Sequence, residues 1–198
     1  MMAQWFKENW KVLDADENFS VSRYKLYDDR MRSASGKILA RILLAEYLKC
    51  PIGDIRIKKG KYGKPIVDSA CGQDILQYNV SHSGDMVALA FTKVRAVGID
   101  IEEQKSIPEY RELAENFFTL EESSRIMKEK NIDLFFQYWT AKEAYVKALG
   151  LGLYKDFKSF YIEGQKVFDN GRLEDKWVIL SAHKAEKYFI SVAVEKGV

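Results

Sequence analysis

Two acidic residues inside an apolar segment are the first candidates for chemistry in this sequence. The segment VGIDIEE, from Val97 to Glu103, has the pattern of a buried strand. Because strand side chains alternate between faces, Gly98, Asp100 and Glu102 share one face. Carboxylate oxygens without clustered His or Cys suit a hard cation such as Mg²⁺. A solvated face on an edge strand explains the same D-x-E spacing, and taken alone the spacing favours that simpler interpretation.

The segment WTAKEAYVKALGLGL carries the second candidate set. Trp139, Glu143 and Lys147 are four residues apart and share one stripe of the expected helix. A surface Glu–Lys pair, worth about 0.3–0.5 kcal/mol, would explain the two charges. It does not explain the aromatic side chains, or Gly150 and Gly152. If a cation bridges Glu143 to the acidic strand, Lys147 lies one turn away, beside a phosphate group.

The first half of the chain offers groups that could hold an anion. The segment KKGKYGKP places Lys64 and three other lysines around two glycines, which suits an anion cradle as well as a solvated hairpin tip. The segment NVSHSGD is expected to be a turn, where Ser81 and His82 bind one phosphate rather than form a nucleophilic dyad. Arg32 lies just before the start of the first long helix that we expect. Its guanidinium could make a bidentate contact with a phosphate, and it could equally well be an ordinary surface residue beside a helix.

The elements that must position these groups follow from periodicity and breakers. We expect a helix over residues 33–50, a strand and an extended segment around a basic loop over residues 54–67, and strands over 86–92 and 96–102. Inward-facing residues of that helix are expected to be Ile38, Leu39, Ile42, Leu43 and Ala45. Each half of the chain therefore pairs a helix with a few strands.

The second half is expected to open with two helices. Thr119 and Glu122 have capping-box spacing, and Asp133 is expected to cap a longer helix that ends at Gly150. The alternating segments SFYIE, WVILSA and YFISVAVE predict antiparallel strands. The fold class is therefore α+β, with two similar halves that meet near residue 96.

Composition excludes several classes of protein. The chain has 198 residues, 47% hydrophobic and 30% charged, with a net charge of +2, which fits a globular protein and not a strongly cationic nucleic-acid binder. Cys50 and Cys71 form neither a disulfide framework nor a metal spacing. No apolar run approaches the roughly 20 residues that span a bilayer, and the N-terminus lacks a signal-peptide pattern. We expect a cytoplasmic protein without a membrane partner.

Five short segments, taken in their order along the chain, together resemble the motifs of one protein family. GKP, NVSHSG, VGIDIE, FFTLEE and WTAKEAYVKALGLGL are similar to the motifs of the Sfp-type 4′-phosphopantetheinyl transferases. The resemblance covers Arg32 to Leu153, and the W-x-x-K-E-A-x-x-K-x-x-G-x-G run is its most specific part. It implies a pseudo-dimer of two α+β halves, residues 1–96 and 97–198, with the active site between them. The first half would bind coenzyme A, and the second would carry the metal and catalytic residues.

The resemblance also implies a reaction. 4′-Phosphopantetheine would move from coenzyme A to a serine hydroxyl of an apo acyl or peptidyl carrier protein, leaving adenosine 3′,5′-bisphosphate. Asp100, Glu102 and Glu143 would hold Mg²⁺, for which Mn²⁺ could substitute. Glu143 is the first candidate to accept the serine proton, directly or through a metal-bound water. Lys147 would contact the pyrophosphate and stabilise the leaving phosphate.

Coenzyme binding is the remaining implied role. The resemblance assigns it to four residues besides Lys147: Arg32, Lys64, Ser81 and His82. Family members often carry lysines before the first helix, whereas Arg23 and Lys25 here have no clear match. Glu122 falls on an acidic position of the family, although its capping-box spacing favours a structural role.

Two alternatives stay open from the sequence. One is a non-catalytic module that binds coenzyme A or a carrier protein, and the other is a different Mg²⁺-dependent phosphotransferase or nuclease. The acidic trio with Lys147 disfavours the first, and the lack of a P-loop motif disfavours the second. We expect a monomer that binds no nucleic acid, with carrier docking near the helix that begins after Thr119. Which carrier protein is served does not follow from the sequence.

Overall fold

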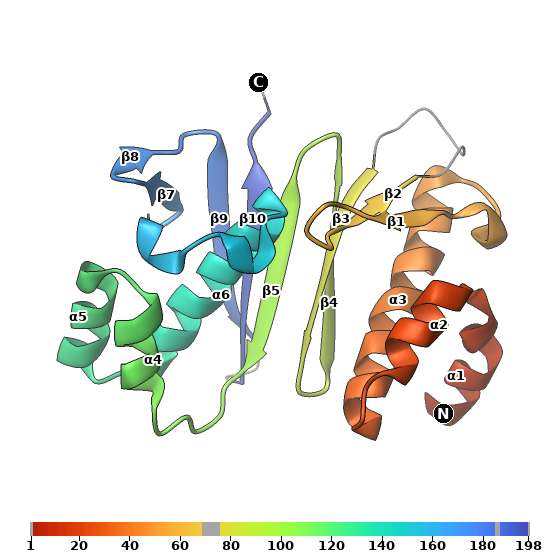
Figure 1. Cartoon of the computed structure of the whole chain (residues 1–198), viewed down its shortest axis with the longest axis horizontal. Coiled ribbons are helices and arrows are strands. Elements are labelled where there is room, and N and C mark those ends of the chain that lie inside the picture. Colours follow the sequence, from red (N-terminus) through yellow and green to blue (C-terminus); the bar gives the residue numbers. More distant parts are fainter. Residues whose placement is uncertain (1, 69–75, 185–186, 198) are drawn as a thin grey trace.

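A computed structural model describes residues 2–68, 76–184 and 187–197 (Figure 1). Cys71 lies outside these described residues. The first part contains α1 (Met2–Asn9), α2 (Ala15–Ser22), α3 (Tyr27–Leu48), β1 (Ile57–Lys59), β2 (Pro65–Val67), β3 (Leu76–Ser83) and β4 (Met86–Lys93). The second contains β5 (Val97–Glu103), α4 (Tyr110–Phe117), α5 (Leu120–Glu129), α6 (Ile132–Leu149), β6 (Phe160–Glu163), β7 (Lys166–Asp169), β8 (Arg172–Leu173), β9 (Trp177–Lys184) and β10 (Tyr188–Glu195).

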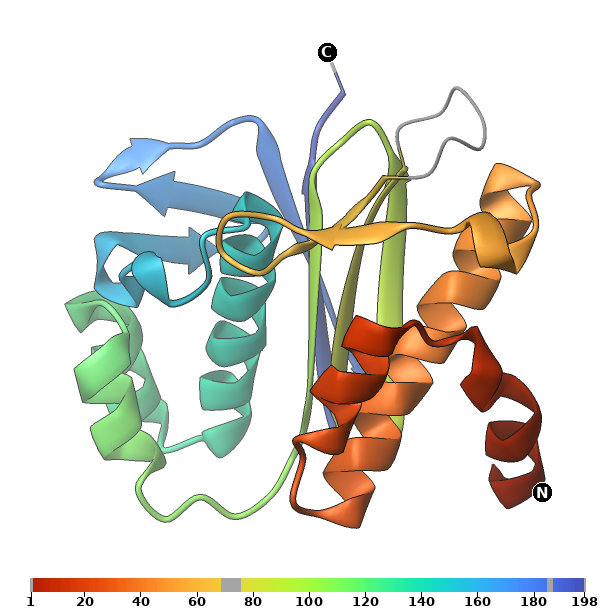
Figure 2. The same cartoon turned by 45° about the vertical axis from the view of Figure 1, so that its right-hand side comes forward.

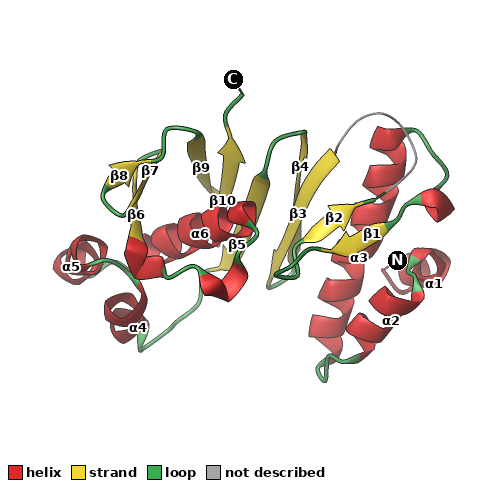
Figure 3. Cartoon of the chain, turned by 45° about the horizontal axis from the view of Figure 1, so that its top comes forward, coloured by secondary structure: helices red, strands yellow, loops and turns green. Residues whose placement is uncertain are grey.

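Each part packs one long helix on antiparallel strands. The described strands pair as β1–β2, β3–β4, β5–β10–β9 and β6–β7–β8, all antiparallel. Figure 3 shows β10, β5, β3 and β4 in the middle of the molecule, with α4 and α5 at one end and α1 to α3 at the other. The predicted α+β pseudo-dimer is therefore confirmed. Within the described residues, no helix is both long and apolar enough to cross a membrane.

The two parts meet along a seam between β3 and β5 that side chains hold together. The backbone N–H of Ile99 donates to Asn79 Oδ1 at 2.9 Å. Farther along, Ile101 N–H donates to Ser81 Oγ at 3.4 Å, and Glu103 N–H donates to Ser83 Oγ at 3.0 Å. Three alternate side chains of β3, those of Asn79, Ser81 and Ser83, thus satisfy backbone donors of β5, which is possible because alternate strand side chains share one face.

This seam corrects the expected turn at NVSHSGD. Small polar residues indicated a loop because their usual partner is their own backbone. Here Asn79, Ser81 and Ser83 are strand residues whose partners are on β5, and the tight turn comes afterwards at Gly84, where φ is +53°.

The position of α6 depends on a glycine in β5. A Cβ added to Gly98 would lie 2.1 Å from the carbonyl oxygen of Ala144, which is well inside van der Waals contact. Gly98 therefore lets the backbone of α6 rest directly on β5. Ala144 and Ala148, both buried, provide the small surface on the helix side. Figure 1 shows α6 lying against β5, and this close packing places Glu143 and Lys147 of α6 in one cleft with Asp100 and Glu102 of β5.

Several sequence predictions differ from the structure in detail. Helix α3 begins at Tyr27, six residues before the expected start, and buries Leu44 rather than Leu43. Asn131, not Asp133, caps α6, because its side chain accepts the N–H of Asp133 at 2.8 Å. Helices α1, α2 and α4 and strands β7 and β8 were not expected. The capping box of α5 is confirmed, as is the end of α6 at Gly150, where φ is +69°.

Candidate active site

The acidic face of β5 and the polar stripe of α6 line one cleft of about 310 Å³. Its lining residues are Val80, Ser81, His82, Asp100, Glu102, Trp139, Glu143 and Lys147. Seven of these eight residues, all except Val80, were candidates in the sequence, and they come from three separate segments. The cleft lies between β3, β5 and α6, so both parts of the chain contribute to it.

Asp100 lies at the centre of the polar contacts in this cleft. Its Oδ1 accepts from Ser81 Oγ at 2.8 Å and from Lys147 Nζ at 2.6 Å. Its Oδ2 is buried and has no partner among the described residues. Burial raises the pKa of the Asp100 carboxyl, and the Lys147 ammonium opposes that rise. Burying a carboxylate oxygen without a hydrogen-bond partner costs free energy of folding. Binding of a hydrogen-bond donor or a cation at this oxygen of Asp100 would therefore be favourable.

Two more carboxylates share the cleft with a single lysine. Glu102 accepts from Ser83 Oγ at 2.8 Å. Burial and the nearby Asp100 both raise the pKa of Glu102. Burial likewise raises the pKa of Glu143, with Lys147 opposing and Asp100 adding to the rise. The surface Glu143–Lys147 pair considered above is not seen, because Lys147 pairs with Asp100 instead.

The donor types in the cleft suit a hard cation, but they are not gathered into a ready binding set. Three carboxylates and an unpartnered buried oxygen match the oxygen ligands that Mg²⁺ prefers. Among the described residues, however, no three His, Cys, Asp or Glu side chains lie close enough together to hold a metal ion. The Lys147 ammonium instead supplies the positive charge beside Asp100.

His82 lines this cleft, whereas Arg32 does not line it but lies close enough to influence His82. Burial lowers the pKa of the His82 imidazole, and the Arg32 and Lys147 cations lower it further. Arg32 Nη1 donates to the carbonyl of Gly84 at 3.0 Å, and Nη2 pairs with Asp29 at 2.5 Å. The guanidinium is thus held beside the β3–β4 turn, within electrostatic reach of His82.

Lys64 is placed differently from the other candidates. Its ammonium donates to the carbonyls of Val97 at 3.0 Å and Ala148 at 2.9 Å, and it does not line the cleft. Burial lowers its pKa to about 8. Figure 2 shows the β1–β2 hairpin reaching across to the end of α6, where these contacts form. Lys64 therefore ties the hairpin of the first half to β5 and α6 of the second.

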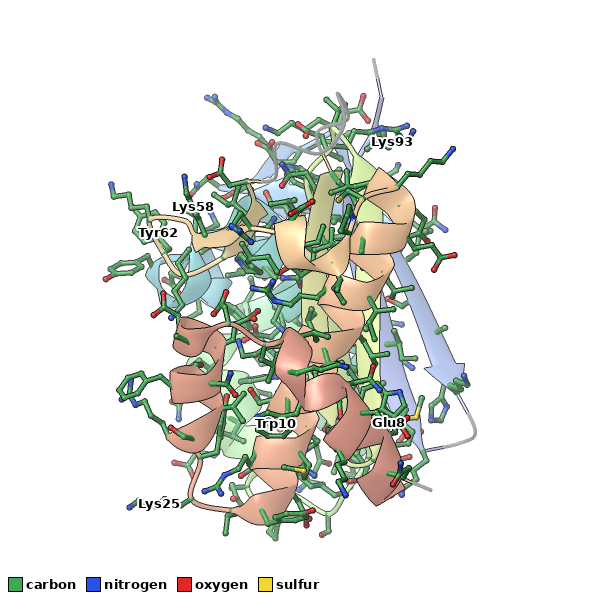
Figure 4. The ribbon with its side chains drawn as sticks, turned by 90° about the vertical axis from the view of Figure 1, so that its right-hand side faces the viewer. Glu8, Trp10, Lys25, Lys58, Tyr62 and Lys93 are labelled. Atoms are coloured by element: carbon green, nitrogen blue, oxygen red, sulfur yellow. The ribbon has the colours of Figure 1, made fainter. Side chains whose placement is uncertain are left out.

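A second cavity of about 660 Å³ adjoins the cleft, since Val80 and His82 line both. It lies between α2, α3, β1 and β3, and its lining carries three lysines, Lys37, Lys58 and Lys59, and three acids, Asp14, Asp16 and Glu17. Lys58 pairs with Asp68, and Arg41 pairs with both Asp14 and Glu17. Figure 4 shows Lys58 and Tyr62 projecting from the β1–β2 hairpin, with Lys25 at the opposite end of the same side. The basic loop was a candidate in the sequence, but Lys37 was not. The sequence shows only that Lys37 lies four residues after Ser33, on the same side of the helix, and both residues line this cavity.

Glu122 lies outside this cleft. It completes the capping box with Thr119, and it forms a buried ion pair with Lys142, Nζ to Oε2 at 2.9 Å. The cap that was favoured from the sequence is confirmed. Burial of Lys142 on the far side of α6 was not expected.

Comparison with known proteins supports the same grouping of motifs. Residues 2–94 match the family model described as "4′-phosphopantetheinyl transferase, N-terminal". Residues 96–192 match the model described as "4′-phosphopantetheinyl transferase superfamily".

Similar individual proteins carry the same description. A phosphopantetheinyl transferase of Thraustochytrium sp. is 30% identical over 203 residues, which cover 92% of this chain and 70% of that protein. The L-aminoadipate-semialdehyde dehydrogenase-phosphopantetheinyl transferase of Homo sapiens is 28% identical, covering 94% of this chain and 68% of that protein. The 4′-phosphopantetheinyl transferase gsp of Aneurinibacillus migulanus is 36% identical over 71% of this chain and 57% of its own length. With both family models and a full-span relative in agreement, the chain belongs to the 4′-phosphopantetheinyl transferase superfamily of enzymes.

Proposed function

We propose that this enzyme transfers 4′-phosphopantetheine from coenzyme A to a serine hydroxyl of an apo carrier protein in a Mg²⁺-dependent reaction. The second product is adenosine 3′,5′-bisphosphate. The observation that carries the proposal is the cleft in which Asp100, Glu102, Glu143 and Lys147 converge, next to a cavity whose lining includes Lys37 and Lys59. The three carboxylates and Lys147 suit a pyrophosphate with its cation, and the two lysines offer donors to a further phosphate.

The residues of the cleft then take separate roles. Asp100, Glu102 and Glu143 would hold Mg²⁺, although their carboxylates are not gathered around one point in this structure, and the ion would neutralise charge on the pyrophosphate. Lys147 donates to the phosphate oxygen on which negative charge develops. Glu143 is the first candidate to accept the proton of the attacking serine hydroxyl, directly or through a water.

Coenzyme binding falls to the first half of the chain. Ser81, His82 and Arg32 bind the adenosine and 3′-phosphate end, with Lys37 and Lys59 adding positive charge in the adjoining cavity. Lys64 supports coenzyme binding from the junction of the two halves, where its ammonium donates hydrogen bonds to the carbonyls of Val97 and Ala148. We accordingly assign residues 1–96 to coenzyme binding and residues 97–198 to the metal and catalysis.

The carrier protein approaches from the α4–α5 side of the cleft. Phe117 is 44% exposed and Leu120 is 77% exposed, flanking the Thr119 cap, and the Phe117 ring contacts that of Trp139 at a 6.0 Å centroid distance. An exposed apolar pair that touches a residue of the cleft suits docking of a partner next to the site. The enzyme acts as a monomer in this proposal.

A mass-spectrometric assay tests the reaction. The protein is incubated with coenzyme A, Mg²⁺ and several apo acyl and peptidyl carrier proteins, and the carriers are weighed. We expect a gain of one phosphopantetheine group that disappears with EDTA and returns with Mg²⁺ or Mn²⁺. Binding of coenzyme A without any carrier modification would support a non-catalytic module instead. Full activity in metal-free buffer would refute the metal role.

A further inference from the structure

Strand β9 forms the outer edge of the three-stranded sheet (Figure 1). One edge pairs with β10 over its whole length. The other edge is covered at its beginning, where Trp177 N–H donates to Glu174 O and Ile179 N–H donates to Gln165 O, both at 3.0 Å. The turn between β6 and β7 therefore covers the first part of this edge.

The same two bonds fix which backbone groups point outward. In an antiparallel pair, the N–H and C=O of every second residue point away from the partner strand. Trp177 and Ile179 bond away from β10, so Ser181 and His183 also present their N–H and C=O to the outside. No described residue bonds these outward groups of Ser181 or His183. Beyond Ile179, β9 is an open, exposed strand edge.

A cavity of about 710 Å³ lies against this open edge. Ser181, Ala182 and His183 line one side, and residues of α5, α6 and the β6–β7 turn line the other. Among its buried lining residues, Leu134 and Phe189 are apolar and Glu122, Thr140 and Ser191 are polar, and the Phe189 ring is stacked between His183 and Phe136. An open strand edge beside a partly apolar groove is the arrangement in which an extended peptide adds a strand and inserts a side chain.

The charges around this cavity indicate which peptide would fit. Glu121 and Glu163 are exposed on its lining, and neither forms an ion pair with a described residue. The cationic Arg125 is paired with Glu129 at 2.9 Å. The rim therefore carries uncompensated negative charge, which complements a basic side chain.

We propose that the open edge of β9 and the adjoining cavity bind an extended peptide segment with basic side chains, as an added strand. The outward N–H and C=O of Ser181 and His183 pair with the peptide backbone. An apolar side chain of the peptide enters the cavity toward Leu134, and a basic one meets Glu163 or Glu121. This surface is separate from the cleft of Asp100 and Glu143, so it serves a partner other than coenzyme A.

Titration with a defined peptide tests the proposal. The probe is acetyl-Lys-Val-Lys-Val-Lys-Val-amide, added to ¹⁵N-labelled full-length protein and followed by amide chemical shifts. We expect saturable shifts at Ser181 and His183 and slower amide hydrogen exchange there. A peptide with Glu in place of Lys should bind more weakly, and one N-methylated at alternate residues should not bind. Equal binding of all three peptides, or no shift at Ser181 and His183, overturns the proposal.

Matched variants separate the backbone contact from the side chain. Ser181→Pro removes the outward N–H without touching the ladder to β10, and should weaken the peptide about 3- to 10-fold, as loss of one hydrogen bond implies. Ser181→Ala keeps that N–H and should bind like wild type. Glu163→Lys should weaken binding more than Glu115→Lys on the exposed surface of α4. If Ser181→Pro does not fold, the N-methylated peptide provides the same test on unchanged protein. Concentration-dependent shifts at β9 without peptide would mean that the edge pairs with a second copy, which also overturns the proposal.

Discussion

Helix α6 carries two lysines that each pair with a carboxylate, and the two pairs differ in how completely their polar atoms are satisfied. Lys142 is fully buried and bonds to Glu122, to the Phe157 carbonyl at 2.8 Å and to the Phe160 carbonyl at 2.5 Å. Its ammonium also lies 4.2 Å from the centre of the Phe160 ring. Both side chains of the Lys142–Glu122 pair have several partners within the protein.

The other pair is left incomplete. Lys147 is 28% exposed, and Asp100 keeps one buried oxygen without a partner among the described residues. Glu102 and Glu143 add negative charge that Lys147 alone cannot balance. The difference teaches how two buried ion pairs on one helix can be told apart. The Lys147–Asp100 pair, with a carboxylate oxygen that lacks a hydrogen-bond donor, indicates a binding site, whereas the Lys142–Glu122 pair, with its polar atoms bonded inside the protein, indicates a structural role.

The largest expected effect comes from breaking the complete pair. Lys142→Met leaves Glu122 buried without its counter-charge, and should lower the free energy of unfolding by about 3–5 kcal/mol. Urea denaturation measures this. The double variant with Glu122→Gln should recover part of the loss, and Lys128→Met, an exposed lysine on α5, should change stability by less than about 0.5 kcal/mol. A loss as small as that of Lys128→Met would show that the pair does not stabilise α5 against α6.

Next comes Glu143, which shares the cleft with the incomplete pair, and here the effect should be on rate and not on stability. Glu143→Gln keeps the shape and helix propensity of the side chain but removes its charge and its basicity. We expect carrier modification to slow by about 10²–10³-fold, as for loss of one preorganised charged group. The melting temperature should stay near wild type, and Glu46→Gln, exposed on α3, should leave the rate unchanged. Near-normal turnover by Glu143→Gln would contradict the proposed site.

The smallest effect concerns Lys64, a lysine bound to carbonyls and not to a carboxylate. Its pKa is about 8 in the folded protein, against an ordinary value of 10.5. Between these values the unfolded chain holds a proton that the folded protein has lost, so stability should rise with pH from about 8 to 10.5.

A comparison of unfolding free energies between wild type and Lys64→Met over this range would show the rise in wild type alone. Lys61→Met, an exposed lysine of the same hairpin, should follow wild type. If Lys64→Met and wild type gave parallel pH profiles, the Lys64 ammonium would not be desolvated as described.

Part of the site could be predicted because it depends on local geometry. Strand alternation places Asp100 and Glu102 on one face, and helical spacing places Trp139, Glu143 and Lys147 on one stripe. The capping box at Thr119 is equally local. The long helix α6 and the strand β10 were therefore predicted well, whereas α1, α2 and α4, helices of only eight residues each, were missed.

The partners of these residues depended on contacts between distant parts of the chain. Lys147 pairs with Asp100, 47 positions away, and bonds to Ser81, 66 positions away, rather than to Glu143 one turn before it. Ser81 lies in a strand, where its hydroxyl accepts a hydrogen bond from the Ile101 N–H of β5. No local sequence pattern reveals that contact, because Ile101 is 20 positions away. Local sequence determined which groups share a face, since backbone geometry alone fixes that. Tertiary structure decided which charges are satisfied, because burial and partners arise when the two halves pack together.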